Sequence, residues 1–244
     1  MIRVLSCFAL ATILSLPAMA ISRRDDKEDV KNAAKKLAGS ANYSWISTPK
    51  SEGGGGGNRP QAGPSEGKTE KDGYTMISSK RGDVTSEGVI KGAKAAVKTA
   101  DGWKSADDIQ GGGGGRPDPA STFARGLKSF KSPAVTAEGL VDKVGELKKG
   151  EEGLYSGDLT EEGAKELLSA GGRQGGNPPT VAEPKGTVKF WVKDGVLVKY
   201  ELNVQGKVTM GQRETAVNRT TTVEIKDVGA TKFEVSDDAK KIVD

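Results

Sequence analysis

The chain has 244 residues, a formal net charge of +4 and only 34% hydrophobic residues, which fits one thin-cored domain. It contains no histidine, and its single cysteine, Cys7, lies close to the N-terminus. This composition excludes histidine-based catalytic triads, disulfides and the common zinc ligand sets, so we expect no catalytic residue, no metal site and no cofactor. Because the charges are interspersed and basic tracts are absent, we also expect no nucleic-acid partner.

Residues 1–20 have the three parts of a cleaved export signal. Arg3 supplies the positive charge, residues 4–16 form a short apolar core, and Ala18-Met19-Ala20 is a small-x-small cleavage site. The apolar run is shorter than the roughly 20 residues that span a bilayer. We therefore expect cleavage near Ala20, a mature chain without a transmembrane span, and a periplasmic or secreted location.

The first half of the mature chain predicts a helix followed by an antiparallel meander. Residues 25–38 have helical apolar spacing and end at Gly39, and the strand predicted at residues 43–48 places Tyr43 and Trp45 on one face. Further strands are predicted at residues 68–71, 74–79, 84–91 and 94–99, with turn sequences between them. Trp103 follows the turn Asp101-Gly102, and we expect it to close one end of the core.

Glycine-rich stretches interrupt these elements. Residues 51–66, 110–119 and 171–184 are predicted to be flexible loops of one domain spanning residues 21–244. Between the last two stretches, helices are predicted from Ser132 to about Leu147 and from Asp158 to Gly171, and a helical turn at residues 122–130.

The last third is predicted to contain strands and a terminal helix. Apolar runs flank Asp194-Gly195 in residues 187–204, a strong signal for a two-residue hairpin. Shorter strands are predicted at residues 207–210, 215–217, 220–226 and 231–235, before a helix capped by Ser236.

The simplest register of this hairpin pairs Lys193 with Val196 and places Trp191 opposite Val198. One face then carries Trp191, Val196, Val198, Tyr200 and Leu202. The other carries Val188, Phe190, Val192 and Leu197. Both faces are partly apolar, and we expect the Trp191 face to line the hollow of the sheet.

Runs of strands separated by runs of helices predict an α+β fold. A strongly curved antiparallel sheet, an unclosed half-barrel with helices packed in its concave face, explains why both hairpin faces are partly apolar.

Several motifs resemble one known family. Tyr43-Ser44-Trp45 after the first helix, Asp101-Gly102-Trp103 after the meander, and Val188-Lys189-Phe190-Trp191-Val192 before Asp194-Gly195 resemble periplasmic lipoprotein-carrier (LolA-like) half-barrel proteins. Residues 220–229 are similar to a pattern in uncharacterised exported bacterial proteins. The carrier resemblance implies an unclosed barrel whose concave face, lidded by helices, takes acyl chains. The carriers' ligand-gating arginine has no counterpart in residues 43–48.

Three functions are compatible with these features. The first is a non-catalytic exported protein that binds an apolar or lipidated ligand, with lipid or a lipidated protein as partner. The second is a structural or protein-interaction module of the bacterial cell envelope, with other envelope proteins as partners and no small-molecule ligand. The third is a carboxylate hydrolase, but the acidic pairs 151–152, 161–162 and 237–238 have the pattern of helix starts or loops. For the first function, the candidate apolar-groove residues are Tyr43, Trp45, Trp103, Trp191, Val198, Tyr200 and Leu202.

The export signal predicts the N-terminus of the exported protein. N-terminal sequencing of protein recovered outside the cytoplasm is expected to begin near Ile21. Recovery of chains that retain Met1 in a membrane fraction would contradict this expectation.

Overall fold

The computed structural model describes residues 25–52, 63–109, 118–170, 179–232 and 234–244. The predicted export signal and the central parts of the three glycine-rich stretches lie outside the described residues. Where the ends of these stretches are described, the predicted loops extend too far. β2 already begins at Ser65, α2 at Pro119 and β9 at Thr180.

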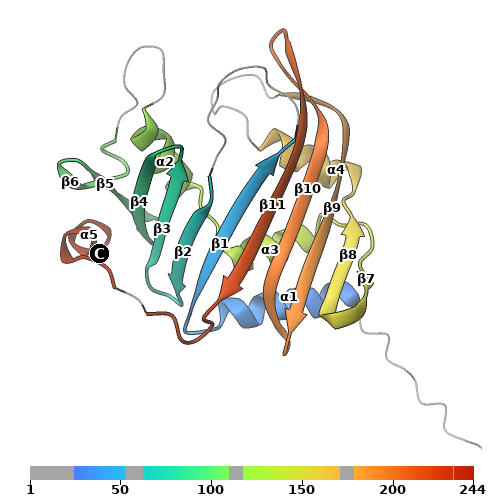
Figure 1. Cartoon of the computed structure of the whole chain (residues 1–244), viewed down its shortest axis with the longest axis horizontal. Coiled ribbons are helices and arrows are strands. Elements are labelled where there is room, and N and C mark those ends of the chain that lie inside the picture. The colour runs from blue at the N-terminus through green and yellow to red at the C-terminus, as the bar shows by residue number, and fades with distance from the viewer. Residues whose placement is uncertain (1–24, 53–62, 110–117, 171–178, 233) are drawn as a thin grey trace, which may run out of the picture.

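Within the described residues, eleven strands form one sheet in which every pairing is antiparallel, in the order β6-β5-β4-β3-β2-β1-β11-β10-β9-β8-β7 (Figure 1). The strands are β1 (Asn42–Ser51), β2 (Ser65–Glu70), β3 (Thr75–Arg81), β4 (Val84–Lys91), β5 (Lys94–Thr99), β6 (Gly102–Ser105), β7 (Lys148–Lys149), β8 (Leu154–Asp158), β9 (Thr180–Lys193), β10 (Val196–Met210) and β11 (Arg213–Lys226). The helices are α1 (Asp26–Ala38), α2 (Pro119–Lys128), α3 (Pro133–Val141), α4 (Glu161–Ser169) and α5 (Asp237–Val243), with a 3-10 turn η1 at Glu151–Gly153.

The first and last strands meet in the middle of this sheet. β1 pairs with β2 on one side and with β11 on the other, so the meander β2–β6 and the strands β7–β10 lie on opposite flanks. β6 and β7 are the two free edges, and the sheet does not close on itself. The predicted α+β fold with a curved, unclosed antiparallel sheet is confirmed.

Four helices cover one face of the sheet, which we call the inner face. Figure 1 shows α1, α3 and α4 behind the strands, where α1 and α4 contact β9 and β10, while α2 contacts β4 and β5. Local sequence explains α1: Asp25 caps it by accepting a hydrogen bond from the Lys27 amide, and its buried stripe ends before Gly39. Its stripe combines two larger residues, Val30 and Leu37, with two alanines, so the helix lies close to the strands below it.

The fifth helix packs on the opposite, outer face. In β4 the side chain of Val89 belongs to a small second core with Ala96 and with Ala239 and Val243 of α5. Gly88 instead faces Leu127 of α2 on the inner face, and successive residues of a strand point to opposite faces. α5 therefore lies outside the inner face that the other four helices cover.

The hairpin of β9 and β10 forms at Asp194-Gly195 as predicted, but the predicted register is wrong beyond the first residues after the turn. Val196 pairs with Lys193, and a β-bulge between Leu197 and Lys199 then shifts the pairing by one residue. Tyr200 consequently lies opposite Phe190 instead of Lys189.

The bulge moves Tyr200 and Leu202 onto the face of Val188 and Phe190, where Phe190 is completely buried. Trp191 is left on the outer face, where the Lys199 Nζ lies 4.6 Å from its ring centroid. The expectation that Trp191 lines the hollow is wrong, because one extra residue in a strand reverses every side chain beyond it.

Several element boundaries also differ from the predictions. α3 ends at Val141 instead of near Leu147, and its residue Val135 is exposed although it is apolar. β7 and β8 were not predicted, and Thr160, after the end of β8, caps α4 in place of Asp158. The segments predicted as separate strands after residue 204 are continuous parts of β10 and β11, and the described residues from 231 to 235 do not form a strand.

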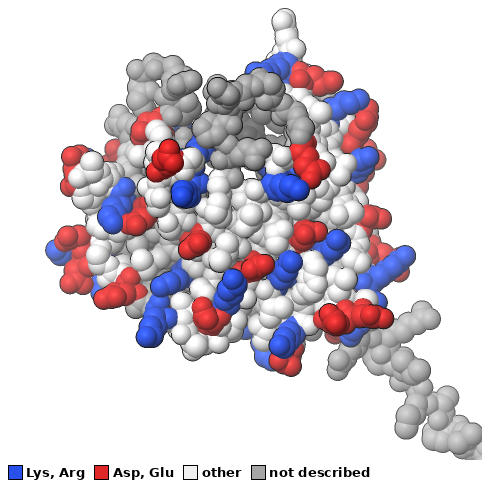
Figure 2. Space-filling model, in the orientation of Figure 1, with Lys and Arg blue, Asp and Glu red and all other residues white. Residues whose placement is uncertain are grey.

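The outer face of β1, β9, β10 and β11 is polar. Lys189 pairs with Glu201 and Lys226 with Glu224, each at 3.4 Å, and Figure 2 shows basic and acidic side chains interspersed over the face presented in Figure 1. Exposed pairs of this kind contribute roughly 0–1 kcal/mol each. The stability of this part of the sheet therefore depends on its inner face.

The revised register makes Phe190 and Trp191 a matched pair of test positions. Phe190→Ala is expected to lower the free energy of unfolding by about 3–5 kcal/mol, because it empties a fully buried site. Trp191→Ala is expected to cost less, about 1–2 kcal/mol, because Trp191 is only half-buried on the outer face and contacts the Lys199 ammonium there. Urea denaturation of both variants measures the difference, and equal losses would contradict the assignment of faces.

Candidate ligand-binding cavity

An apolar cavity of about 330 Å³ lies on the inner face between the sheet and α2. Its sheet side is formed by Trp45, Ile77, Tyr200 and Val223 from β1, β3, β10 and β11. Its helix side is formed by Phe123 and Leu127 from α2, Phe130 from the connection to α3, and Pro133, the first residue of α3. The cavity therefore lies where the expected half-barrel groove would be, under one helix.

Trp45 and Phe130 stack to form one wall of the cavity. Their ring centroids are 5.7 Å apart with an interplanar angle of 17°, and the Trp45 Nε1 donates a hydrogen bond to the Thr69 Oγ1 at 3.2 Å. The Trp45 ring lies across Gly67, its partner on β2, so closely that a Cβ at residue 67 would overlap the indole. A glycine is needed here because any side chain would displace the tryptophan.

A row of serines borders this apolar wall. Ser47, Ser65 and Ser79 are direct neighbours across β1, β2 and β3, and all three line the cavity. The Ser65 Oγ donates a hydrogen bond to the Ser79 Oγ at 2.9 Å. The lining thus changes from aromatic and aliphatic groups to hydroxyl groups along the strands.

Buried tyrosines supply the remaining polar groups near the cavity. Tyr200 is only 5% exposed, and burial, followed by the neighbouring Tyr43, raises the pKa of its hydroxyl well above the ordinary value. Burial likewise raises the pKa of Tyr43, against the opposing effect of hydrogen bonds that include Ser132. Both hydroxyls stay neutral at physiological pH, so neither tyrosine adds charge near the cavity.

The structure brings together only some of the predicted groove residues. Trp45 and Tyr200 line the cavity, while Tyr43 and Leu202 pack in the same inner core without lining it. Trp191 lies on the outer face, and Val198 is the half-buried extra residue of the bulge. The role of each residue in ligand binding stays a prediction.

The residues on the helix side of the cavity were not among the groove residues predicted from the sequence. Phe123, Leu127 and Phe130 all lie in the helical turn predicted at residues 122–130, which was not linked to the groove. Their spacing of four and three residues indicated a buried helix face, but a spacing alone does not show whether that face meets a packed sheet or a gap.

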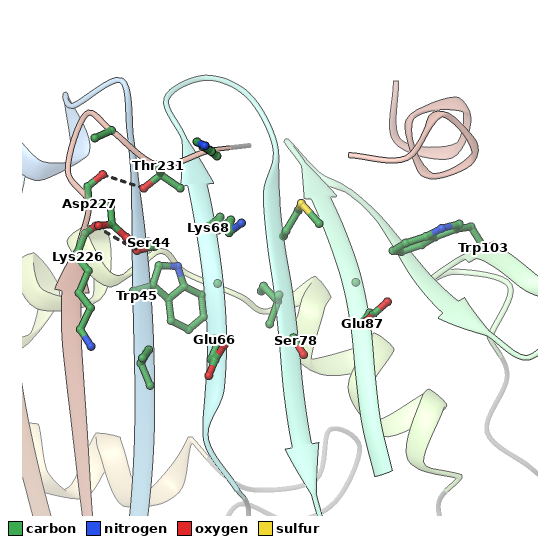
Figure 3. Close-up of a pocket in the computed structure, with 17 residues that line it drawn as sticks. Ser44, Trp45, Glu66, Lys68, Ser78, Glu87, Trp103, Lys226, Asp227 and Thr231 are labelled. Atoms are coloured by element: carbon green, nitrogen blue, oxygen red, sulfur yellow. Dashed lines mark hydrogen bonds between the residues drawn. The ribbon is translucent and has the colours of Figure 1, made fainter. Parts of the chain in front are cut away.

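Trp103 belongs to a second hollow, on the outer face, which we call the outer groove (Figure 3). This groove has a volume of about 630 Å³ and runs over β1–β4 between Trp103 and residues 227–232. Trp103 packs near α5 with Met76, so it does not close the end of the main core as expected.

A tight turn fixes one wall of the outer groove. The Ser44 Oγ donates a hydrogen bond to the Asp227 Oδ2 at 2.8 Å, and the Thr231 Oγ1 donates to the Asp227 carbonyl oxygen at 2.8 Å (Figure 3). The Thr231 amide donates to the Asn42 Oδ1, also at 2.8 Å. These bonds tie the segment after β11 to the start of β1.

The two hollows differ in the chemistry of their linings. Six ionisable residues line the outer groove: Glu66, Lys68, Glu87, Lys226, Asp227 and Lys232. An apolar ligand there would remove water from charged groups without replacing their hydrogen bonds, which is costly. The inner cavity has one ionisable cationic residue, Lys131, and is the better candidate for an apolar ligand although it is smaller.

The acidic pairs noted in the sequence occupy structural positions. Glu151 and Glu152 lie in η1, and the pairs 161–162 and 237–238 occupy the first turns of α4 and α5, where carboxylates favour the helix dipole. Among the described residues, no group of three or more potential ligands gathers as a metal site. None of the helices in the described part of the chain has the length and hydropathy to span a bilayer.

Comparison with known proteins gives similarity to solved structures only. No protein-family model and no curated protein sequence matches the chain. It is similar to LprF from Mycobacterium bovis, with 12% identity over 86% of this chain and 96% of that chain and a TM-score of 0.44. It is also similar to the LolA superfamily protein NE2245 from Nitrosomonas europaea, with 6% identity over 91% and 98% of the two chains and a TM-score of 0.33. The fold assignment itself rests on the sheet order and the helix positions described above.

The contact between Gly67 and Trp45 can be tested with two glycine variants. Gly67→Ala is expected to lower the free energy of unfolding by about 1–3 kcal/mol, because the new methyl group forces Trp45 off Phe130. Gly139→Ala in α3 is the control, since its methyl group meets no atom within 4 Å and should stabilise the helix by up to about 1 kcal/mol. Urea denaturation of both proteins measures the effect, and an unchanged Gly67→Ala variant would contradict the described packing.

Proposed function

We propose that this is a non-catalytic exported protein, periplasmic or secreted, that binds an apolar or lipidated ligand in the groove of its half-barrel. The observation that carries the proposal is the apolar cavity between the inner face of the sheet and α2. The export signal supports the proposed location.

The size and lining of the cavity support a small amphipathic ligand. Its volume of about 330 Å³ is near the lower end of the range of roughly 300–1,000 Å³ for small-molecule sites. Each methylene group that leaves water for an apolar site contributes about 0.8 kcal/mol. We therefore expect affinity to rise about fourfold for each added methylene until the cavity is filled.

The rest of the inner face restricts where a ligand enters. Under α1 and α4, the side chains of Val188, Phe190 and Leu197 are completely buried in a packed core. A ligand at that end would have to displace helices that contact β9 and β10. The proposed site is therefore confined to the end of the sheet under α2.

The same packed core favours a second candidate function. If the cavity under α2 takes no ligand, the domain is a structural or protein-interaction module of the cell envelope whose aromatic residues serve the core. The two functions make opposite predictions for uptake of an acyl chain.

A fluorescence experiment separates them. The chain has three tryptophans, and the double variant Trp103→Phe/Trp191→Phe leaves Trp45, which lines the cavity, as the only one. A brominated fatty acid, 9,10-dibromostearate, is expected to quench this Trp45 emission saturably, because bromine quenches indole only at close contact.

The matched control is the variant Trp45→Phe/Trp103→Phe, which retains only Trp191 on the outer face. Little quenching is expected there. Equal quenching of both reporters would indicate nonspecific adsorption, and an unquenched Trp45 would favour the structural module.

A further inference from the structure

The segment that covers the cavity carries charge of one sign only. Between Asp118 and Glu138 the sequence contains no acidic residue, and its charged residues are Arg125, Lys128 and Lys131. This stretch comprises α2, the connection to α3 and the first turn of α3. The segment over the cavity thus contributes charged side chains of positive sign only.

Of these three residues, Lys131 is the one at the cavity. Lys128 forms an ion pair with Asp107, and Arg125 does not line the cavity. Lys131 follows Phe130, is exposed, and lines the cavity together with that phenylalanine. Within the described residues, no carboxylate pairs with Lys131 within 4 Å.

The rest of the lining gives the site two chemically distinct parts. Trp45, Phe130 and Leu127 offer an apolar surface, whereas the serine row of β1–β3 and Lys131 offer hydrogen-bond donors. An ammonium group and hydroxyl groups together match an anionic oxygen-rich head group, and a charge-assisted hydrogen bond is about twice as strong as a neutral one.

From this arrangement we infer that the cavity selects a single-chain anionic amphiphile, whose carboxylate or phosphate head group contacts Lys131 while its chain lies against Trp45 and Phe130. The inference rests on the proposed function and adds the ligand class and the residue that sets charge selectivity. The small volume favours one chain, and the lack of an acidic residue in the lining disfavours a cationic head group.

The test compares ligands of equal chain length and different charge. Binding of decanoate, monodecyl phosphate, decan-1-ol and decylamine to the full chain is measured below their micelle concentrations by displacement of a neutral fluorescent probe. The anionic ligands are expected to bind more tightly than the alcohol, and the amine most weakly. A preference shared by decanoate and monodecyl phosphate identifies anionic charge as the feature recognised, whereas a preference for one of them identifies the head group.

Variants at residue 131 test the specific contact. Lys131→Gln is expected to weaken decanoate binding about three- to tenfold and to leave decan-1-ol binding unchanged, while Lys131→Arg retains the anion preference. Lys148→Gln is the matched control, because it removes the same charge from exposed strand β7 and does not touch the cavity.

The possible results distinguish the two proposals. If decan-1-ol binds but Lys131→Gln and Lys148→Gln affect decanoate equally, the assignment of Lys131 is overturned and the apolar-ligand function survives. If no amphiphile displaces the probe or quenches Trp45, both proposals fail.

Discussion

The pairing of β1 with β11 is the interaction on which the rest of the structure depends. It joins the beginning and the end of the described chain in the middle of the sheet, through partners such as Trp45 and Ile225 that are separated by most of the sequence. Without it the sheet would separate into β2–β6 with β1 and β7–β11, and the cavity, which draws on Trp45 and Tyr200, would lose its floor. Contacts so distant in sequence have a high loop-closure cost, so we expect this pairing to form late in folding.

Local signals predicted most elements because they depend on neighbouring residues alone. Such signals predicted the cap and apolar stripe of α1, the turns of the meander and the Asp194-Gly195 hairpin. They did not predict the bulge after Leu197. Two registers of an apolar hairpin differ only in which side chains share a face, and the tertiary contacts of each face select between them. The two-residue strand β7 and the glycine-containing β8 gave too short a pattern to be recognised.

The candidate site was only partly predictable for the same reason. Aromatic residues on strands marked Trp45 and Tyr200 correctly as inner residues, but Trp103 and Trp191 are also aromatic residues on strands and lie on the outer face. What separates them is the position of α5 and the bulge, which are tertiary features. α2 packs over Gly88, whereas the indole of Trp45 lies across Gly67. The cavity under α2 depends on these tertiary placements, and no single residue indicates it.

An unclosed sheet leaves two edges with unpaired backbone groups, and such edges invite other chains to add strands. Here both edges are short: β6 spans Gly102–Ser105 and β7 only Lys148–Lys149. The β7 edge consists of two exposed lysines, a residue type that proteins place on edges to repel a neighbouring strand. The two outermost strands therefore offer only short templates for intermolecular β-sheet, and the lysines of β7 make one of them unfavourable for pairing.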